Sequence, residues 1–495
     1  MTSFDPSLPP RESLLVFSDV HLGSDLNDCT KNVARRSASI DRDLVLFLGH
    51  YRRQAPAGDR WRIVIAGDFI DFIGMAIAVG AVHDRMDTEP NAEEREHGLG
   101  NASDHARAKL RRVAERHADV FAELAGFVAD GHALTLVHGN HDIEFHWDGV
   151  KDDMRAILLG HAERGHPGLD REEFFARIEF SPWFFYRDGV AYIEHGHQYD
   201  TFCSTENVMA PLSPLDPRRL ARGFSDILLR FVVKPTLGMK EHGHEHAGMI
   251  YYLTFGARLG VRGLVRLGAC FASAVIEMFR LRRAYLTEAA QTLRAEHERR
   301  VGLLAEATRV GADRLRALLK LQELPVTRSI RGILASVLLD RLALAVLSLF
   351  TLVGVAVLGI YHGHALYAAL GVVAAWALFH RHLSQQRQID PADRLRMKAS
   401  QLAKLFPAAF VVMGHTHIPV RAPAGDATYI NLGSWAEEQE AEAPEGIALR
   451  ATRTHLVIHP GKAPSGGRPD AQLFRWRSGA GPQQYNVTSG TWRVG

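Results

Sequence analysis

Five short apolar runs, rich in residues that favour β-strands, each end in a group of polar side chains. The runs span residues 14–17, 62–66, 133–137, 190–194 and 409–413. Stretches with apolar side chains at helical spacing lie between several of them, as at residues 105–131. Strands that alternate with helices predict a layered α/β domain.

The polar groups after these runs contain side chains that bind metal ions well. They are Asp19 and His21, then Asp68 and Asp71, then Asn140, His141 and Asp142, then His195 and His197, and last His415 and His417. Open α/β sheets place ligand sites just beyond the carboxyl ends of their strands, so we expect these side chains to meet in one crevice. Histidine is also frequent overall, with 26 of 495 residues.

The residue types suit two divalent cations. A carboxylate can bridge two cations, whereas a neutral imidazole or an amide oxygen binds one. Asp19 and His21 are two residues apart, as are His415 and His417, so each pair lies on one side of an extended chain. Oxygen and nitrogen donors without thiolate favour Mn, Fe or Zn over a structural Cys–zinc site. Two such ions about 3.5–4 Å apart would bind a phosphate and activate a water.

In their order and spacing, the five groups resemble the motifs of the calcineurin-like metallophosphoesterase superfamily. The matching motifs are Asp19-x-His21, Gly67-Asp68-x-x-Asp71, Gly139-Asn140-His141-Asp142, His195-Gly196-His197 and Gly414-His415-x-His417. The resemblance covers about residues 12–200 and 390–460. It implies a fold of the α/β class, a four-layer β-sandwich flanked by helices, with a dinuclear metal centre.

The resemblance also implies a role for individual residues. One metal ion would be held by Asp19, His21, Asp68 and His417, and the other by Asp68, Asn140, His195 and His415. Asp68 would bridge the two ions. His141 would contact the phosphate and protonate the leaving oxygen, with Asp142 orienting its ring. Asp71 is too far along the chain to be an obvious ligand, so we expect it to have a supporting or structural role.

The most apolar part of the chain lies between the two blocks that carry the motifs. Residues 342–361 are 20 consecutive residues without a charge, and as a helix they would span about 30 Å, the thickness of the hydrocarbon core of a bilayer. A second apolar run of 15 residues, 365–379, follows a short turn. The pattern predicts a helical hairpin, either spanning a membrane, lying in it as a re-entrant or interfacial segment, or buried in a soluble core.

Charge is divided unevenly along the chain. Residues 211–340 hold 21 Lys and Arg against 12 Asp and Glu, whereas the rest of the chain holds 37 against 44. Arg258, Arg262 and Arg266 recur every four residues, which places them on one helix face. This face suits either the anionic surface of a membrane or solvent. The acidic character of the motif-bearing blocks disfavours a nucleic-acid substrate.

The expected location is the cytoplasmic face of a membrane. The excess of Lys and Arg beside the hairpin predicts that both of its ends are cytoplasmic. Cys29, Cys203 and Cys270 are odd in number and far apart, which argues against a disulfide scaffold and for a reducing compartment. Residues 1–12 hold no basic patch followed by an apolar stretch, so we expect no cleaved signal peptide.

These patterns predict a core in two parts, residues 1–200 and 391–460. A basic helical insertion would occupy residues 201–390, and residues 461–495, rich in Gly, Pro, Ser and Gln, would form an extended C-terminal tail. The expected activity is hydrolysis of a phosphate ester or pyrophosphate by a metal-activated hydroxide. The alternative is a membrane-tethered scaffold whose phosphoesterase fold binds a partner without turnover.

The metal ligands indicate the reaction class but leave the substrate open. The expected partner is a phosphorylated small molecule or a lipid-linked substrate. Attachment to a membrane suggests a lipid-linked phosphate or pyrophosphate, because confinement raises the local concentration of both partners. Bacterial UDP-diacylglucosamine pyrophosphatases share the Ser-Asp-x-His-Leu sequence of residues 18–22. That group usually has Arg where this chain has His141, so phosphoprotein and nucleotide substrates also remain open.

Overall fold

The structure, a computed structural model, describes most of the chain. The described residues are 11–26, 31–54, 59–82, 85–236, 249–362, 365–386, 391–436, 453–461 and 468–487. The chain divides into two compact units, of which the first contains residues 1–221, 291–323 and 392–495 and the second residues 222–290 and 324–391. The first unit has mixed α/β structure, whereas the described part of the second unit is helical.

One mixed sheet of the first unit has seven strands in the order β12-β11-β10-β1-β2-β3-β4. Their bounds are β1 (Arg11–Phe17), β2 (Asp59–Ala66), β3 (Ala133–Val137), β4 (Ile178–Ser181), β10 (Thr454–His459), β11 (Asp470–Arg477) and β12 (Gly481–Gln484). Strands β1 to β4 run parallel, while β10, β11 and β12 extend the sheet with antiparallel pairs. The carboxyl ends of β1, β2 and β3 therefore lie at one edge of this sheet.

A second mixed sheet has five strands in the order β5-β6-β7-β9-β8. Their bounds are β5 (Phe184–Arg187), β6 (Ala191–Glu194), β7 (Phe410–Met413), β8 (Val420–Ala424) and β9 (Ala427–Asn431). Strands β6, β7 and β9 are parallel, and β5 and β8 close the two edges as antiparallel strands. β6 and β7 thus meet although more than 200 residues of sequence separate them.

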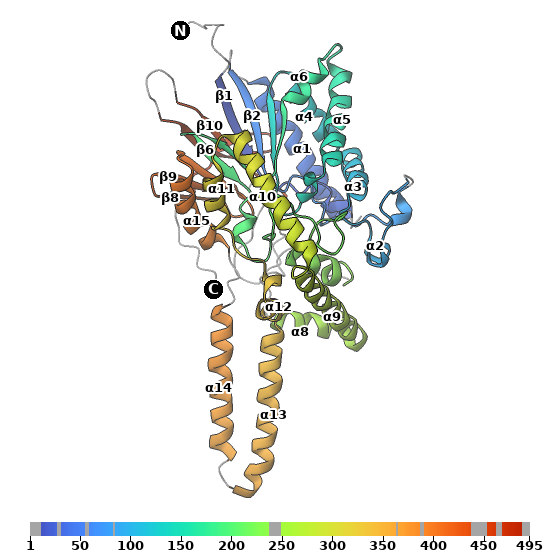
Figure 1. Ribbon diagram of the computed structural model, residues 1–495, viewed down its shortest axis with the longest axis vertical. Helices are drawn as coiled ribbons and strands as arrows, with labels where there is room; N and C mark the ends of the chain where they lie inside the picture. Colours follow the sequence, from blue (N-terminus) through green and yellow to red (C-terminus); the bar gives the residue numbers. More distant parts are fainter. Residues whose placement is uncertain are drawn as a thin grey trace. The chain divides into compact units, whose positions relative to one another are not determined.

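The two sheets share a buried apolar core because side chains alternate along each strand. Leu14 and Val16 of β1 belong to one buried cluster together with Ile193 of β6 and Val412 of β7. Their neighbour Phe17 faces the other way, into a cluster that the helices cover. Figure 1 shows strands of both sheets, among them β1 and β2 of the larger sheet and β8 and β9 of the smaller one.

Helices cover the outer face of each sheet. Those beside the larger sheet include α1 (Lys31–Arg53), α3 (Ser103–Arg116), α4 (Ala118–Ala129) and α5 (Asp148–Gly165). Those beside the smaller sheet include α10 (Glu288–Thr308), α11 (Ala312–Leu319) and α15 (Ala392–Leu405). The two short helices α2 (Ala92–His97) and α6 (Arg171–Ala176) complete the described α-helices of this unit. The expectation of a mixed α/β fold is confirmed.

The second unit contains two long apolar helices, α13 (Leu339–His362) and α14 (Ala365–Gln386), which pack side by side (Figure 1). Their segments 339–358 and 366–383 are long and apolar enough to cross a membrane. Only 6% of the residues in the first window and none in the second are buried. In a hairpin buried in a soluble core, most of these residues would be buried, so the structure does not support the interpretation of α13 and α14 as core helices.

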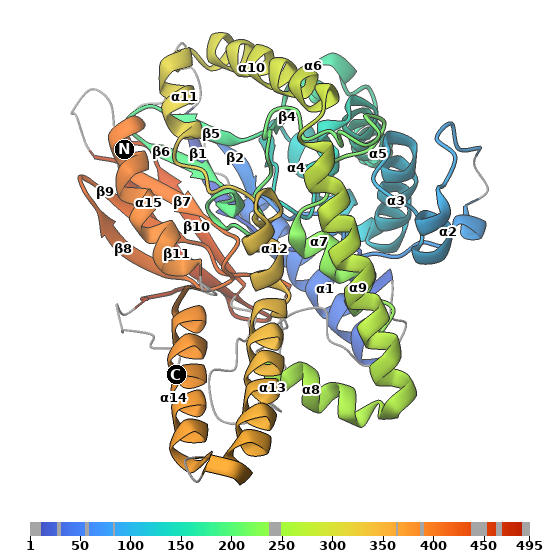
Figure 2. The ribbon, with the colours of Figure 1, turned by 60° about the horizontal axis from the view of Figure 1, so that its bottom comes forward.

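The other helices of the second unit lie near the start of this hairpin. They are α7 (Phe224–Leu228), α8 (Met249–Arg258), α9 (Gly260–Ala284) and α12 (Ile330–Ser336). The short helix α12 packs against both α9 and α13, as Figure 2 shows. The start of the hairpin and α9 are therefore neighbours within this unit.

Two of the expected boundaries differ from the structure. Residues 461–495 were expected to form an extended tail, but β11 and β12 lie within this segment and extend the larger sheet. Ala471 and Leu473 of β11 alternate with exposed residues and are buried, a strand pattern that the Gly- and Pro-rich composition around it obscures. Residues 201–390 were expected to form one insertion, but the structure divides them between the two units. Val301, Leu315 and Leu318, in the middle of this segment, pack in the core of the first unit.

Candidate metal centre

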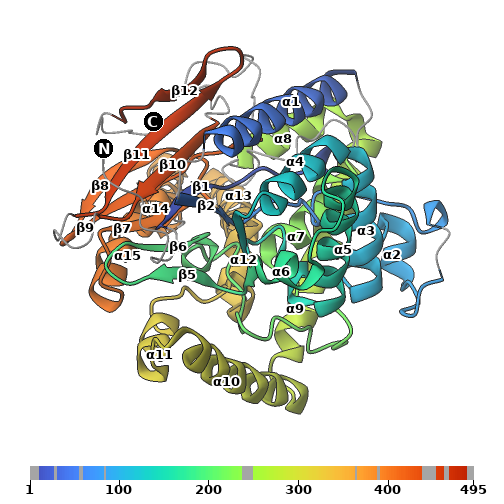
Figure 3. The ribbon, with the colours of Figure 1, turned by 90° about the horizontal axis from the view of Figure 1, so that it is seen from above.

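The candidate site lies where five loops leave the carboxyl ends of β1, β2, β3, β6 and β7. Two contacts connect the loops after β1 and β2, since Val20 and His21 both donate backbone hydrogen bonds to the carbonyl oxygen of Asp68. A third contact crosses from one sheet to the other, because His195 after β6 reaches the carbonyl oxygen of Ala66 at the end of β2. In Figure 3, the strands of the two sheets lie between the helices α1, α4 and α5 on one side and α15 on the other.

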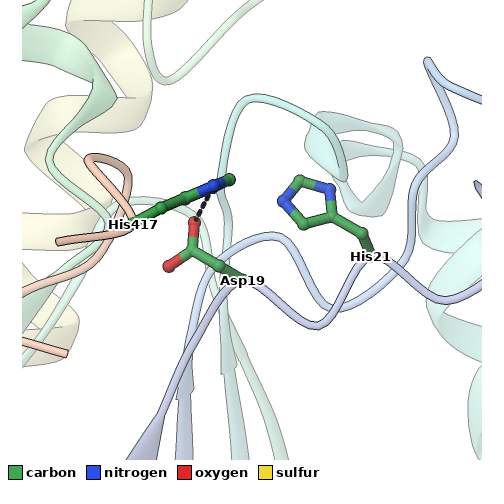
Figure 4. Close-up of side chains that lie close together, drawn as sticks. All are labelled: Asp19, His21 and His417. Carbon is green, nitrogen blue, oxygen red and sulfur yellow. Dashed lines mark ion pairs between the residues drawn. The ribbon is translucent and has the colours of Figure 1, made fainter. Parts of the chain in front are cut away.

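Asp19, His21 and His417 form the first group of donor atoms. Asp19 Oδ1 lies 3.1 Å from Nε2 of His417, and the rings of His21 and His417 are 5.5 Å apart between centroids. Figure 4 shows both imidazoles beside the Asp19 carboxylate. One ligand atom from each of the three residues lies within 4.8 Å of the other two. Three donors this close together can bind one cation.

Asp68 joins this group to a second one. Its Oδ2 lies 3.7 Å from Nε2 of His21 and 3.2 Å from Nε2 of His195. Asn140 Oδ1 lies 3.0 Å from the same nitrogen of His195. The centroid of the His415 ring is 5.2 Å from that of His195. The structure thus brings all seven predicted metal ligands together, with Asp68 between the two groups.

Strained backbone conformations are concentrated at the residues of the site. Eight non-glycine residues of the described chain have a positive φ, and five of them are predicted metal ligands, namely Asp19, His21, Asp68, His415 and His417. This left-handed conformation costs about 1–3 kcal/mol for a residue with a side chain and persists where the surrounding structure imposes it. Such strain clusters at functional sites, so its position here favours a functional role for the five residues.

Two glycines allow the loops to approach this closely. A Cβ atom on Gly139 would lie 2.0 Å from Oδ1 of Asp68, and one on Gly414 would lie 2.4 Å from Oδ2 of Asp19. No side chain fits at such a distance, so each glycine is required by the carboxylate packed against it. The close packing of these carboxylates therefore explains why glycine occupies positions 139 and 414.

His195 shows that the donor set fits a cation. Its Nδ1–H donates to the carbonyl oxygen of Ala66, 3.0 Å away, so its Nε2 is the nitrogen that faces the oxygen atoms of Asp68 and Asn140. Burial lowers the pKa of His195, but the negative charge of Asp68 outweighs this and raises the pKa to about 9. A field that retains a proton at this nitrogen would equally attract a metal cation in its place.

The neighbouring groups have the charge states that metal ligands need. Burial raises the pKa of Asp68, but His195 and His141 outweigh it and hold that pKa well below its usual range. The pKa of His21 falls to about 4, first because the ring is buried and then because His141 is close. At neutral pH the site therefore presents an ionised carboxylate and a neutral imidazole, which are the forms that bind metal.

The carboxylate that orients His141 is Asp71, and our expectation for Asp142 was wrong. His141 Nδ1 lies 2.7 Å from Asp71 Oδ1, so the ring donates to that carboxylate. Burial raises the pKa of Asp71, but the His141 ring holds it well below its ordinary value. The supporting role that we expected for Asp71 is therefore the orientation of His141.

Asp142 instead connects two loops of the site. Its two carboxylate oxygens accept hydrogen bonds from the backbone N–H groups of Gly139, at 2.6 Å, and Phe69, at 2.8 Å. Burial, followed by the nearby charge of Asp68, raises the pKa of Asp142 to about 7. Adjacent residues on a turn point in different directions, which is why the neighbour of His141 in sequence is not its partner in space.

Asp200 is a further residue of the site that the sequence analysis missed. Its Oδ2 lies 3.1 Å from His415 Nε2, so this nitrogen donates to it and leaves Nδ1 of His415 as the nitrogen able to bind a cation. Ligand atoms of Asp200, Cys203 and His415 lie within 4.8 Å of one another. The signal in the sequence was a carboxylate five residues after His195 in the same polar segment, but no spacing rule identified it.

Comparisons with known proteins do not assign the chain to a family. Neither a comparison with models of protein families nor a search of curated proteins finds a match to this chain. The site is therefore defined by the geometry of its own residues.

Proposed function

We propose that the chain is a dinuclear-metal phosphoesterase with a calcineurin-like fold, cleaving a phosphate ester or a pyrophosphate bond. The observation that carries this proposal is the position of Asp68, whose Oδ2 lies 3.2 Å from His195 and 3.7 Å from His21. A buried carboxylate with imidazole nitrogens on two sides suits a bridge between two cations, to which the imidazoles would bind in their neutral form. The two sheets with helices on both outer faces are also compatible with the four-layer sandwich of that superfamily.

In this proposal the donors would divide into two sets around Asp68. One set would consist of Asp19, His21, Asp68 and His417, and the other of Asp68, Asn140, His195 and His415; the proximity of these side chains supports the division. When bound, two divalent cations such as Mn, Fe or Zn would polarise the phosphoryl group and generate a hydroxide from water at neutral pH. The chain itself holds two of these donors in place, through the Ala66 carbonyl for His195 and through Asp200 for His415.

His141 is the residue that would handle the proton of the leaving group. The bond from its Nδ1 to Asp71 fixes the tautomer and directs Nε2 away from that carboxylate. The side chain of His141 is 17% exposed, as is that of His417, whereas the side chains of Asp19 and Asp68 are almost fully buried. A substrate would therefore reach the site from the side of His141 and His417. Protonation by a positioned imidazole contributes about 10²–10⁴ in rate.

We further propose that the hairpin of α13 and α14 anchors this activity to a membrane, with its ends on the cytoplasmic side. The length, apolarity and exposure of the two helices support the anchor, and the excess of Lys and Arg in residues 211–340 supports the orientation. A phosphorylated small molecule or a lipid-linked phosphate is then the substrate class that we favour, rather than a nucleic acid.

Hydrolysis by the purified full chain tests the proposal. With Mn²⁺ present, we expect release of p-nitrophenol from p-nitrophenyl phosphate or from bis-p-nitrophenyl phosphate, and Asp68→Ala should abolish it. Asp152→Ala is the matched control, because the Asp152 side chain is 73% exposed on α5 and should leave the rate unchanged. Bound metal without hydrolysis of any phosphate ester or pyrophosphate would instead favour the non-catalytic scaffold.

A further inference from the structure

Helix α9 exposes a stripe of large apolar side chains. Val261, Val265 and Ile276 are 80%, 69% and 67% exposed. At about 100° per residue they fall within about 60° of one another around the helix. The buried residues of α9, among them Leu267 and Met278, lie on the opposite side. α9 therefore has two apolar faces, one packed in its own unit and one exposed.

Arginines border the exposed stripe. Arg262 and Arg266 are both exposed, and neither has an ion pair with an acidic residue in the described part of the chain. They lie one turn apart on the flank of the stripe formed by Val261 and Val265. A helix that combines an apolar face with unneutralised cations beside it is typical of one that lies in the headgroup layer of a membrane.

The position of α9 within the second unit also agrees with a location in the headgroup layer of a membrane. The short helix α12 packs against both α9 and α13, so α9 lies next to the end at which the hairpin begins (Figure 2). If α13 and α14 span a bilayer, the ends of the hairpin lie at the level of the lipid headgroups. An amphipathic helix at that level would lie with its apolar stripe toward the acyl chains and its arginines among the phosphates.

We infer that α9 is an in-plane membrane helix that binds anionic phospholipid headgroups through Arg262 and Arg266. The alternative occupant of the stripe is a second copy of the chain. A two-fold contact through this face would bring the arginines of both copies toward one another without an acidic partner, which disfavours it. The inference is independent of the metal centre, which lies in the other unit.

Hydrogen–deuterium exchange of the full chain tests this inference. The protein is mixed with vesicles or nanodiscs of phosphatidylcholine alone, or of phosphatidylcholine and phosphatidylglycerol in equal parts. We expect peptides of α9 to exchange more slowly with the anionic lipid than with phosphatidylcholine alone, and α5 peptides to exchange at the same rate in both. High salt should reduce the difference, because it screens the arginines.

Two variants and one control separate the causes. Arg262→Glu combined with Arg266→Glu should abolish the dependence on anionic lipid, since each arginine near such a surface is worth about fivefold in affinity. Val261→Asp combined with Val265→Asp should abolish the slower exchange with either lipid. Arg314→Glu on α11 makes the same charge change at an exposed position and should behave like the original chain. Circular dichroism checks that each variant keeps its helical content.

Equal exchange of α9 with both lipids would overturn the inference. So would slower exchange that depends on protein concentration and not on lipid composition, because that result would assign the stripe to a second copy of the chain. Loss of phosphatase activity has no bearing on either readout, so failure of the proposed function and failure of this inference are distinguishable.

Discussion

The two units depart from the ordinary distribution of side chains in opposite ways. In the first, Asp19, Asp68 and His195 are almost completely buried together, where apolar residues are normally found. In the second, Leu347 and Phe350 of α13 are 66% and 70% exposed, where polar residues are normal. Each departure costs free energy unless something outside the chain compensates for it. These departures support the two proposals, in which cations would compensate in the first unit and lipid in the second.

Of the variants considered, Gly139→Ala should have the largest effect on the candidate metal site of the first unit. The added Cβ would overlap Oδ1 of Asp68, so we expect loss of metal binding at the bridge and loss of hydrolysis. Metal content and p-nitrophenyl phosphate turnover measure both effects. The matched control is Gly160→Ala, where a Cβ meets nothing within 4 Å on helix α5, and which should stabilise that helix by about 0.5–1 kcal/mol. A Gly139→Ala protein with full metal content would contradict the site geometry.

A buried polar cluster with its own partners should behave differently from the candidate metal site. Glu94 is fully buried and pairs with Arg219, whose Nη2 lies 2.7 Å from Oε2 of Glu94. We expect Glu94→Gln to lower the free energy of unfolding by about 3–5 kcal/mol, measured by urea denaturation, and to leave metal content unchanged. A loss of metal in this variant would show that the two clusters are not independent.

The same ion pair predicts a direction for the pH dependence of stability. Burial raises the pKa of Glu94, but Arg219 outweighs it and holds that pKa below its ordinary value of 4.5. The stabilisation is therefore fully present above the unfolded pKa and is lost as the pH falls through the folded value. Urea denaturation of the original chain and of Glu94→Gln across the acidic range should show the two stabilities converging toward low pH.

Phe350→Arg should weaken the insertion of the second unit's apolar hairpin into a membrane. An arginine near the middle of a membrane-spanning helix costs about 3 kcal/mol of insertion free energy, so we expect less of the protein in the membrane fraction after alkaline extraction. Leu286→Arg is the control, because Leu286 is 69% exposed in the same unit but lies outside the hairpin. If both variants, like the original chain, remain soluble without detergent, the anchor proposal is wrong.

Asp71→Asn should have the smallest effect and refine the role of His141. Removing the negative charge that His141 faces should lower kcat about 10–100-fold, with two metal ions still bound. Because Asp71 acts through the ring, the pH profile of kcat should also shift, which a merely structural role would not produce. Asp142→Asn, whose carboxylate bonds to backbone N–H groups, should lower the stability of the loops without that shift.

The grouping of the predicted metal ligands could be inferred from the sequence because these residues occupy similar places, just after strands. Parallel strands bring their carboxyl ends together, so the positions of Asp19, Asp68 and Asn140 after three such strands are enough to predict that they meet. The apolar helices were equally accessible, since length and absence of charge are properties of the sequence itself. Both predictions rest on one-dimensional patterns that have a direct meaning in space.

The remaining residues of the site depend on side-chain direction, which spacing does not determine. Asp71 and Asp142 are both close to His141 in the fold, but only the geometry of two turns decides which of them contacts its ring. Asp200 belongs to the site because its loop passes His415, more than 200 residues away in sequence. The left-handed backbone at five of the predicted ligands could not be predicted either, because no local pattern separates it from other conformations of Asp and His.

The metal content per chain is the decisive measurement for the proposed dinuclear centre. After reconstitution of the purified full chain with Mn²⁺ and removal of excess ion, elemental analysis should find two metal ions in the original chain and fewer in Asp68→Ala. A stoichiometry of one, or two ions retained without the Asp68 carboxylate, would contradict a centre in which this aspartate joins two cations.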